Sequence, residues 1–345
     1  MTTRRLLGRT FLGATALAAA SIAAPASAQR VDNIVAFGDS YADDGNLFQI
    51  IGFNPAPQVY PTGRFSGGTN YIDTLSTLLD VPVQNFAIGG ALTDNTNTNG
   101  PGIPGFVTEW NAFLGGGGGP FPTVSGTFDE SDLVTVSIGG NDARFYQQTG
   151  GTLAGAPAAA TASAAFAEAG LDALVGAGAQ NISFLAGNTS ILPEIAGNTT
   201  AQGIRNAYST TFNAQMQDVL AGYAADGVMV HYLDLTLVGQ NIIANPGAYG
   251  FTNTGACTPA PSCVTDSNYA NQYLFYVDAL HLTSAGFRVV GQYIATQLQA
   301  PLTMKAPSEL ALETARQFGR TLNSRADLGS PRDGDVAEGL KFFVV

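Results

Sequence analysis

Residues 33–41 read Asn-Ile-Val-Ala-Phe-Gly-Asp-Ser-Tyr, and this stretch decides the fold class. Its first five residues form a short apolar run that ends at Gly38, which is typical of a buried β-strand. Gly38-Asp39-Ser40 follows directly and consists of residues that favour turns. The sequence therefore predicts a serine hydroxyl at the end of a buried strand, where a nucleophile can be presented.

Apolar runs and helical patterns alternate along the rest of the chain. Further strands are predicted at 83–88, 133–138, 182–185 and 228–233. Helices are predicted over 70–79, 156–177, 201–223 and 284–298, the last capped by Thr283 or Ser284. This alternation predicts an α/β fold, with a mostly parallel sheet of about five strands covered on both faces. Ligand sites in such sheets form at the carboxyl ends of the strands.

The N-terminus has the pattern of an export signal. Arg4, Arg5 and Arg9 precede an apolar run over 11–24, and Ala26-Ser27-Ala28 fits a small-residue cleavage site. We therefore expect residues 1–28 to be a bacterial signal peptide, of Sec or twin-arginine type, on a secreted, periplasmic or cell-surface protein. In an exported protein, Cys257 and Cys263 are expected to pair as a disulfide.

The charge balance limits the choice of partners. The formal net charge is −12, so the acidic chain is expected to repel phosphate backbones, and no nucleic-acid partner is predicted. Asn95–Gly100 imitates the start of an EF-hand loop, but Phe106 stands where a bidentate Glu is needed, so no calcium site is predicted.

The chain contains two histidines, His231 and His281. Asp278 precedes His281 by three residues, so its carboxylate can accept the Nδ1–H of the ring and fix the tautomer of a base. His231 lies inside the apolar strand pattern 228–233 and is interpreted as structural. Asp234 follows it by three residues, an offset that places the two side chains on opposite faces of a strand.

Two further strands end in glycine pairs. Gly89-Gly90 follows the strand at 83–88, and Gly139-Gly140 follows the strand at 133–138 and precedes Asn141. Glycines allow backbone N–H groups to approach a ligand, and Asn141 adds a side-chain amide. Together they predict donors for a developing oxyanion in acyl transfer.

These segments, in this order, resemble the SGNH hydrolases, the GDSL-type esterases and lipases. The resemblance rests on GDSYADDGN at 38–46, the glycines at 89–90, Gly-Gly-Asn-Asp at 139–142 and Asp-Ala-Leu-His at 278–281, and it covers about residues 33–298. GRFSGG at 63–68 is also similar to a segment in one branch of the family. Tyr41 departs from the Leu of the family's name-giving motif.

The resemblance implies a three-layer αβα sandwich of the flavodoxin-like type and a serine esterase or lipase that needs no cofactor. It implies Ser40 as nucleophile, His281 as base and Asp278 as the residue that orients it. The oxyanion hole would use the backbone N–H groups of Ser40 and Gly90 and the side chain of Asn141. Short-chain esters are the default expectation, with a pocket shaped by the loops at 47–62, 93–128 and 244–272.

The sequence admits two other interpretations. Gly38–Ala42 nearly matches the G-x-S-x-G elbow of the α/β-hydrolases, but that elbow follows several strands, whereas Ser40 follows the first. A non-catalytic secreted adhesin or binding module would suit the Gly-rich loops and the acidic surface.

The predicted domains are a signal peptide at 1–28, a hydrolase domain at 29–300 and a tail at 301–345. Residues 308–322 are predicted to form a second C-terminal helix. Some bacterial relatives of this resemblance are autotransporters, and the tail is similar to the junction with their outer-membrane barrel. We therefore expect a truncated or barrel-free relative, with outer-membrane association through the tail as an open alternative.

Overall fold

The computed structural model describes residues 31–329, so the predicted signal peptide lies outside the described residues. Its centre is a sheet of five parallel strands in the order β2-β1-β3-β4-β5. The strands are β1 (Asn33–Gly38), β2 (Val83–Asn85), β3 (Asp132–Ser137), β4 (Asn181–Ala186) and β5 (Met229–Asp234). All five predicted strands are present, and the flavodoxin-like strand order is confirmed.

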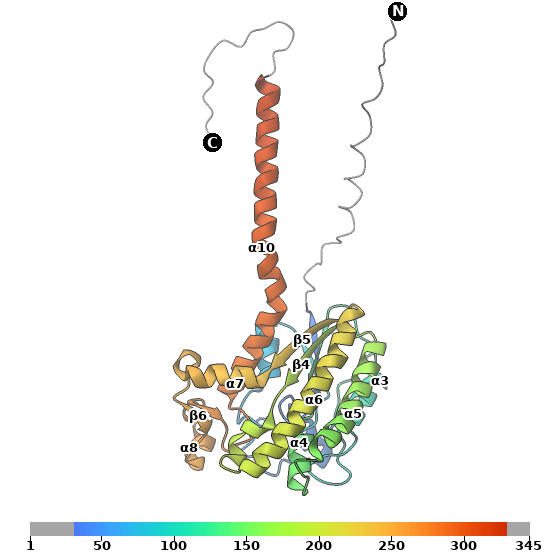
Figure 1. Cartoon of the computed structure of the whole chain (residues 1–345), viewed down its shortest axis with the longest axis vertical. Helices are drawn as coiled ribbons and strands as arrows, with labels where there is room; N and C mark the ends of the chain where they lie inside the picture. Colours follow the sequence, from blue (N-terminus) through green and yellow to red (C-terminus); the bar gives the residue numbers. More distant parts are fainter. Residues whose placement is uncertain (1–30, 330–345) are drawn as a thin grey trace, which may run out of the picture.

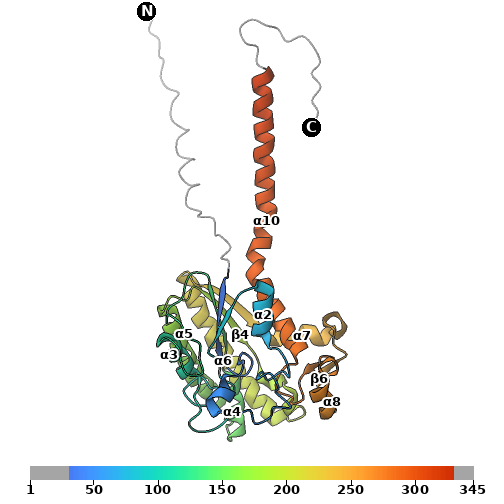
Figure 2. The same cartoon turned by 180° about the vertical axis from the view of Figure 1, so that it is seen from behind.

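Helices cover both faces of the sheet (Figures 1 and 2). One face carries α3 (Phe106–Leu114), α4 (Gly140–Gln148), α5 (Ala156–Gly176) and α6 (Thr199–Ala225). The other face carries α2 (Tyr71–Leu79), α7 (Leu235–Ala244) and the first turns of α10 (Ser284–Gly329). The predicted three-layer αβα sandwich is therefore confirmed.

Successive side chains of β1 belong alternately to the two apolar cores. Val35 and Phe37 belong to the apolar cluster beneath α3, α5 and α6, and Ile34 and Ala36 belong to the cluster beneath α2 and α10. Successive side chains of a strand point to opposite faces, so a strand that is apolar throughout is buried on both sides. The chain leaves β1 toward β2 on one side and reaches β3 on the other. The carboxyl ends of β1 and β3 therefore flank a topological switch point, where ligand sites form in such sheets.

Segments predicted as loops contain regular structure, and there the prediction was wrong. The first, 93–128, contains α3, whose apolar residues lie at helical spacing within Gly-rich surroundings. The second, 244–272, contains η3 (Pro246–Tyr249), β6 (Asn253–Ala256), α8 (Ala260–Thr265) and α9 (Ser267–Ala270). β6 pairs with β7 (Tyr273–Phe275). Elements of four to six residues are too short to show a period in the sequence.

The remaining short elements connect these layers. They are α1 (Asn46–Ile51), η1 (Thr189–Ile191) and η2 (Pro193–Ile195). By length and composition alone, α5 could cross a membrane. In the structure, one face of α5 packs into the core beside α6.

The last helix is longer than predicted. Thr283 caps α10, because its Oγ1 accepts the N–H of Gly286 at 3.2 Å. The helix then continues from Ser284 to Gly329, where the sequence predicted separate helices at 284–298 and 308–322. The segment that joins the two predicted helices contains Pro301 and Pro307, which supply no backbone N–H, so its local sequence favours a break that the continuous helix does not show. α10 projects from the body beyond the sheet (Figure 1). α10 also runs through residue 300, where the sequence predicted the end of the hydrolase domain. That domain boundary stays a prediction.

Candidate active site

Ser40 lies in a tight turn that follows β1. Gly38 has φ +124°, and a Cβ there would lie 2.0 Å from the carbonyl oxygen of Ser137 on β3, so the turn requires glycine. The Ser40 side chain is nearly buried. Within the described part of the chain, the backbone N–H of Ser40 has no hydrogen-bond acceptor, so it is free to bind a ligand.

The structure brings Ser40, His281 and Asp278 into one hydrogen-bonded chain. Ser40 Oγ lies 2.7 Å from His281 Nε2, and His281 Nδ1 lies 2.7 Å from Asp278 Oδ2. Both distances are within the reach that a nucleophile, a base and an orienting carboxylate require. The arrangement allows the imidazole to remove the proton of the Ser40 hydroxyl.

Asp278 is kept ionised. Burial by itself would raise the pKa of this carboxyl, but the His281 ring beside it and its hydrogen bonds lower the pKa to about 2. Its Oδ1 accepts the backbone N–H groups of Leu280 and His281 at 2.9 Å, and its Oδ2 accepts the hydroxyl of Tyr60 at 2.7 Å. A charged Asp278 can therefore hold the tautomer of His281 and stabilise an imidazolium.

The turn that carries Asp278 and His281 is strained and anchored. Ala279 has φ +60°, a left-handed conformation that is unfavourable for a residue with a Cβ. Its carbonyl accepts the N–H of Glu194 at 3.0 Å, and the carbonyl of Leu280 accepts the hydroxyl of Tyr41 at 3.2 Å. These contacts hold the turn in place against the strain.

Aromatic rings surround the imidazole. Phe65 stacks on the His281 ring, with centroids 5.1 Å apart and planes inclined by 30°. The rings of Tyr41 and Tyr60 lie at 5.9 Å and 6.5 Å. Phe65 belongs to the segment 63–68, which is similar to a segment in one branch of the family. Through Phe65 this segment contacts the site.

The segments that were predicted to bind the oxyanion also meet at the site. The N–H of Gly89 donates to Asp43 Oδ2 at 2.6 Å, whereas that of Gly90 has no acceptor within residues 31–329, which makes Gly90 the available donor. The side-chain amide of Asn141 donates one hydrogen to the carbonyl of Ala91 at 3.2 Å. An amide has two hydrogens, so the second is left for a ligand.

Buried carboxyls support these segments, and this supporting role was not predicted from the sequence. Glu109 on α3 accepts the N–H of Gly38 at 2.6 Å and that of Ile88 at 3.2 Å. Asp43 binds four backbone N–H groups, including that of Gly89, and Asp142 accepts both the N–H and the hydroxyl of Thr93. Burial raises the pKa of Asp43 and of Asp142 to about 6, and that of Glu109 well above its usual range. A lone Glu within the apolar stretch 106–114 was the available indication of this role.

The other predicted residues lie apart from this constellation. His231 is buried in β5, where its Nε2 has no hydrogen-bond partner and burial lowers the pKa of the ring. Cys257 and Cys263 form a disulfide with an S–S distance of 2.06 Å, which belongs to the same buried cluster as Tyr276. No group of three or more His, Cys, Asp or Glu side chains within 31–329 is arranged to hold a metal ion.

A cavity with a volume of about 110 Å³ opens beside Ser40 and His281. Its walls come from the ends of β3 and β4, from η1, α6 and α7, and from the start of α10. None of the loops at 47–62, 93–128 and 244–272 lines this cavity, so the prediction that they shape it was wrong. Tyr60 of the segment 47–62 contacts Asp278 instead, whereas the cavity lies between secondary-structure elements that the sheet positions.

The fold and this constellation define the class as an α/β protein with a Ser–His–Asp site at the carboxyl edge of a parallel sheet. A sequence model of the family described as GDSL-like lipase/acylhydrolase matches residues 34–294. The chain belongs to this family, as the resemblance implied.

Two curated relatives are similar to parts of the chain. Thermolabile hemolysin from Vibrio parahaemolyticus is 24% identical over 67% of this chain and 52% of its own length. Acetylajmalan esterase 2 from Rauvolfia serpentina is 32% identical over 19% of this chain and 25% of its own length. The chain thus spans about half or less of the curated relatives that it matches.

Solved structures are similar at lower identity. An extracellular lipase from Streptomyces rimosus is 17% identical with a TM-score of 0.39, over 61% of this chain and 83% of that one. An inhibitor-bound aryl esterase from M. smegmatis is 14% identical with a TM-score of 0.42, over 78% of this chain and 99% of that one. The family assignment rests on the family model, and the named relatives give no support to a link with barrel-bearing autotransporters.

Proposed function

We propose that this protein hydrolyses carboxylic esters through an acyl-enzyme on Ser40. The observation that carries the proposal is the continuous chain of two 2.7 Å contacts from Ser40 through His281 to Asp278. A hydroxyl, an imidazole and a charged carboxylate in this order form the arrangement that activates a serine.

In the proposed reaction, Ser40 Oγ attacks the ester carbonyl while its proton passes to His281 Nε2. The oxyanion accepts the N–H groups of Ser40 and Gly90 and the free amide hydrogen of Asn141. When the tetrahedral intermediate collapses, the bond to the alcohol oxygen breaks and His281 returns the proton to that oxygen. A water molecule then repeats the sequence on the acyl-enzyme and releases the carboxylic acid and the free serine. No cofactor is needed for these steps.

A fluorophosphonate probe tests the proposal directly. Trypsin should release residues 31–64 as one peptide, in which Ser40 is the only serine. We expect one probe adduct per chain on this peptide, and no adduct on it in Ser40→Ala or His281→Ala. Ser40→Ala should also abolish hydrolysis of p-nitrophenyl acetate. A secreted adhesin or binding module should not react at Ser40, so an unlabelled wild-type peptide 31–64 would favour that alternative.

We also propose export to the periplasm, the cell surface or the medium. The arginines and apolar run of residues 1–28 support this, as does the disulfide, because disulfides persist in oxidising compartments. N-terminal sequencing of the protein recovered outside the cytoplasm should begin near residue 29. Association of residues 301–345 with an outer membrane stays a prediction that membrane fractionation can test.

A further inference from the structure

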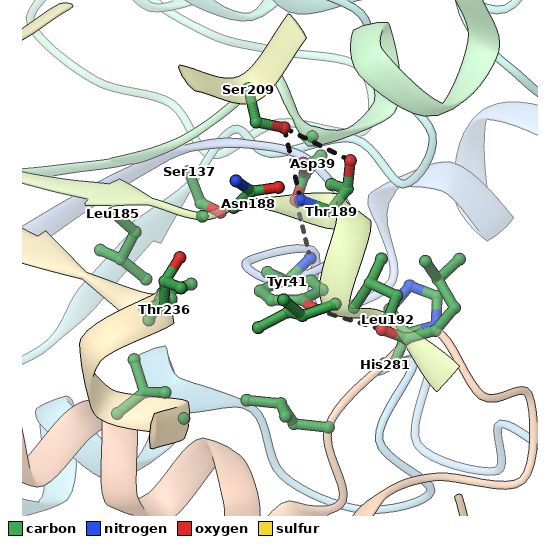
Figure 3. Close-up of a pocket in the computed structure, with 18 of the residues that line it drawn as sticks. Asp39, Tyr41, Ser137, Leu185, Asn188, Thr189, Leu192, Ser209, Thr236 and His281 are labelled. Atoms are coloured by element: carbon green, nitrogen blue, oxygen red, sulfur yellow. Dashed lines mark hydrogen bonds between the residues drawn. The ribbon is translucent and has the colours of Figure 1, made fainter. Parts of the chain in front are cut away.

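The cavity beside the triad has two chemically different parts. Polar side chains gather at one side, where Figure 3 shows Asp39, Ser137 and Ser209 close together. The other part lies between α7 and α10, and its lining includes Val238 and Ile242, which belong to a buried apolar cluster. Because Ser40 and His281 line the same cavity, a substrate that reacts with Ser40 can extend an apolar group into this second part.

The rim of the apolar part includes residues of η1 and α7. Ile191 of η1 lines the cavity and is 48% exposed, so this side chain lies between the cavity and the solvent. Opposite it lies Gly239 of α7. A Cβ added at Gly239 would meet a single neighbour within 4 Å, the Cδ1 atom of Ile191 at 3.9 Å. The space between these two residues therefore takes about one methyl group, and the glycine at position 239 leaves it unfilled.

Nothing in the backbone at this position requires a glycine. Gly239 lies in the interior of α7 and does not have a left-handed φ. An interior helical glycine is less favourable than alanine because it loses more backbone freedom on folding. The glycine thus weakens α7 slightly and leaves the space beside Ile191 unfilled.

We propose that the part of the cavity between α7 and α10 binds the acyl chain of the ester, and that Gly239 sets the chain length accepted. This inference rests on the proposed esterase function. The alcohol must take its proton from His281 Nε2 and leave, whereas the acyl group stays on Ser40 until water attacks it. An apolar subsite beside Ser40 suits the group that stays.

The cavity volume limits the acyl group. An engineered cavity of roughly 150 Å³ lined by aliphatic and aromatic side chains accommodates benzene. The 110 Å³ here covers the polar and the apolar part together, so the apolar part takes a chain of at most about four to six carbon atoms. This narrows the short-chain expectation drawn from the sequence to butanoyl to hexanoyl esters.

Two ester series test the proposal. The first contains p-nitrophenyl esters from acetate to decanoate, and the second contains acetates of increasingly long alcohols. For the wild type we expect kcat/KM to rise about four-fold per methylene in the acyl series up to about hexanoate, because burying one methylene contributes ~0.8 kcal/mol. In Gly239→Leu we expect hexanoate to lose ten-fold or more while acetate changes less than about two-fold, since one pocket group discriminates by roughly 10–200-fold.

Gly222→Leu is the matched control. Gly222 is a helical glycine on α6 with nothing within 4 Å of an added Cβ, and it does not line the cavity. Its variant should keep the wild-type acyl profile, and both variants should melt within a few degrees of the wild type. Adding Ile191→Ala to Gly239→Leu should restore part of the hexanoate rate, because the two side chains compete for the same gap.

The outcomes separate the two proposals. If the wild type hydrolyses esters but Gly239→Leu changes every acyl length equally, or changes the alcohol series instead, the acyl subsite is disproved and the esterase function stands. A wild type that hydrolyses none of these esters and leaves Ser40 unlabelled disproves the esterase function itself.

Discussion

The two sides of the site use carboxyl groups in opposite ways. On the imidazole side, Asp278 faces His281 and Tyr60, and its pKa is held at about 2. On the nucleophile side, Asp39 adjoins Ser40, and burial raises its pKa to about 7. The pKa values of Asp43, Glu109 and Asp142, which bind backbone N–H groups nearby, are also raised, chiefly by burial.

This difference in pKa indicates the function of each carboxyl group. A carboxylate that must stabilise an imidazolium has to stay charged, and the ring beside it provides the compensating interaction. A carboxyl that only accepts N–H groups positions loops, and it does so at an electrostatic disadvantage when it ionises in the interior. The site thus combines one charged partner with a scaffold of strongly desolvated acids.

The largest loss of activity is expected from substitutions of His281 and Asp278 on the imidazole side. His281→Ala should lower kcat/KM by on the order of 10⁴–10⁶, and Asp278→Asn by about 10⁴, because the asparagine favours the wrong tautomer of the ring. The measurement is hydrolysis of p-nitrophenyl butanoate at neutral pH. Asp278→Asn variants that retain more than a tenth of the rate would remove the charged partner from the mechanism.

A smaller loss is expected from the oxyanion donors on the nucleophile side. Asn141→Ala removes one amide donor and should lower kcat by roughly 10²–10³. Probe labelling of Ser40 should slow but persist, since the Ser40–His281 contact is untouched. A loss below about five-fold would show that Asn141 does not face the oxyanion.

The scaffold acids should appear in the pH dependence of stability. Asp39 has a folded-state pKa of about 7 against 3.8 in the unfolded chain, so between these values the folded state holds a proton that the unfolded state lacks. The free energy of unfolding should therefore fall as pH rises from about 4 to 7, with a contribution from Asp39 on the order of 4 kcal/mol.

Asp39→Asn isolates this contribution. Asparagine keeps an oxygen that can accept the N–H of Tyr41 but does not ionise. Denaturant unfolding at pH 4.5 and 7.5 should show a smaller decrease in the variant than in the wild type. Equal decreases in both proteins would contradict the raised pKa.

The smallest effect is expected at the second histidine. His231 lies in the middle of β5 and has no contact with the triad, so His231→Phe should change kcat/KM less than about two-fold. Replacing a buried polar atom that lacks a partner can leave stability unchanged or raise it. A large loss of activity in a folded His231→Phe protein would reopen the assignment of the base to His281.

The sequence predicted the sheet better than the elements at its edge. The strands at 133–138 and 182–185 are apolar throughout because both faces are covered, and this pattern is local. The helical spacing of α3 lies within Gly-rich segments that indicate a loop, and the strands of the β6–β7 sheet are too short to show a period. The continuity of α10 depends on helix propagation beyond 298, where the local pattern indicated a break.

For the site, motif residues were predictable and their supports were not. Ser40, Asp278 and His281 each occupy a strand end or turn that the sequence indicates. Glu109 binds Gly38, 71 residues away in the chain, and no local pattern reveals such a contact. No local pattern reveals the cavity either, because its walls come from segments spread over about 250 residues of the chain.

The separation of 241 residues between Ser40 and His281 has a consequence for biosynthesis. The hydroxyl is made early, and the imidazole that activates it is made 241 residues later. At about 5–20 residues per second, a nascent chain carries an inert serine for roughly 10–50 s before its partner exists. The enzyme we propose would thus be unable to attack cellular esters until this histidine has been made.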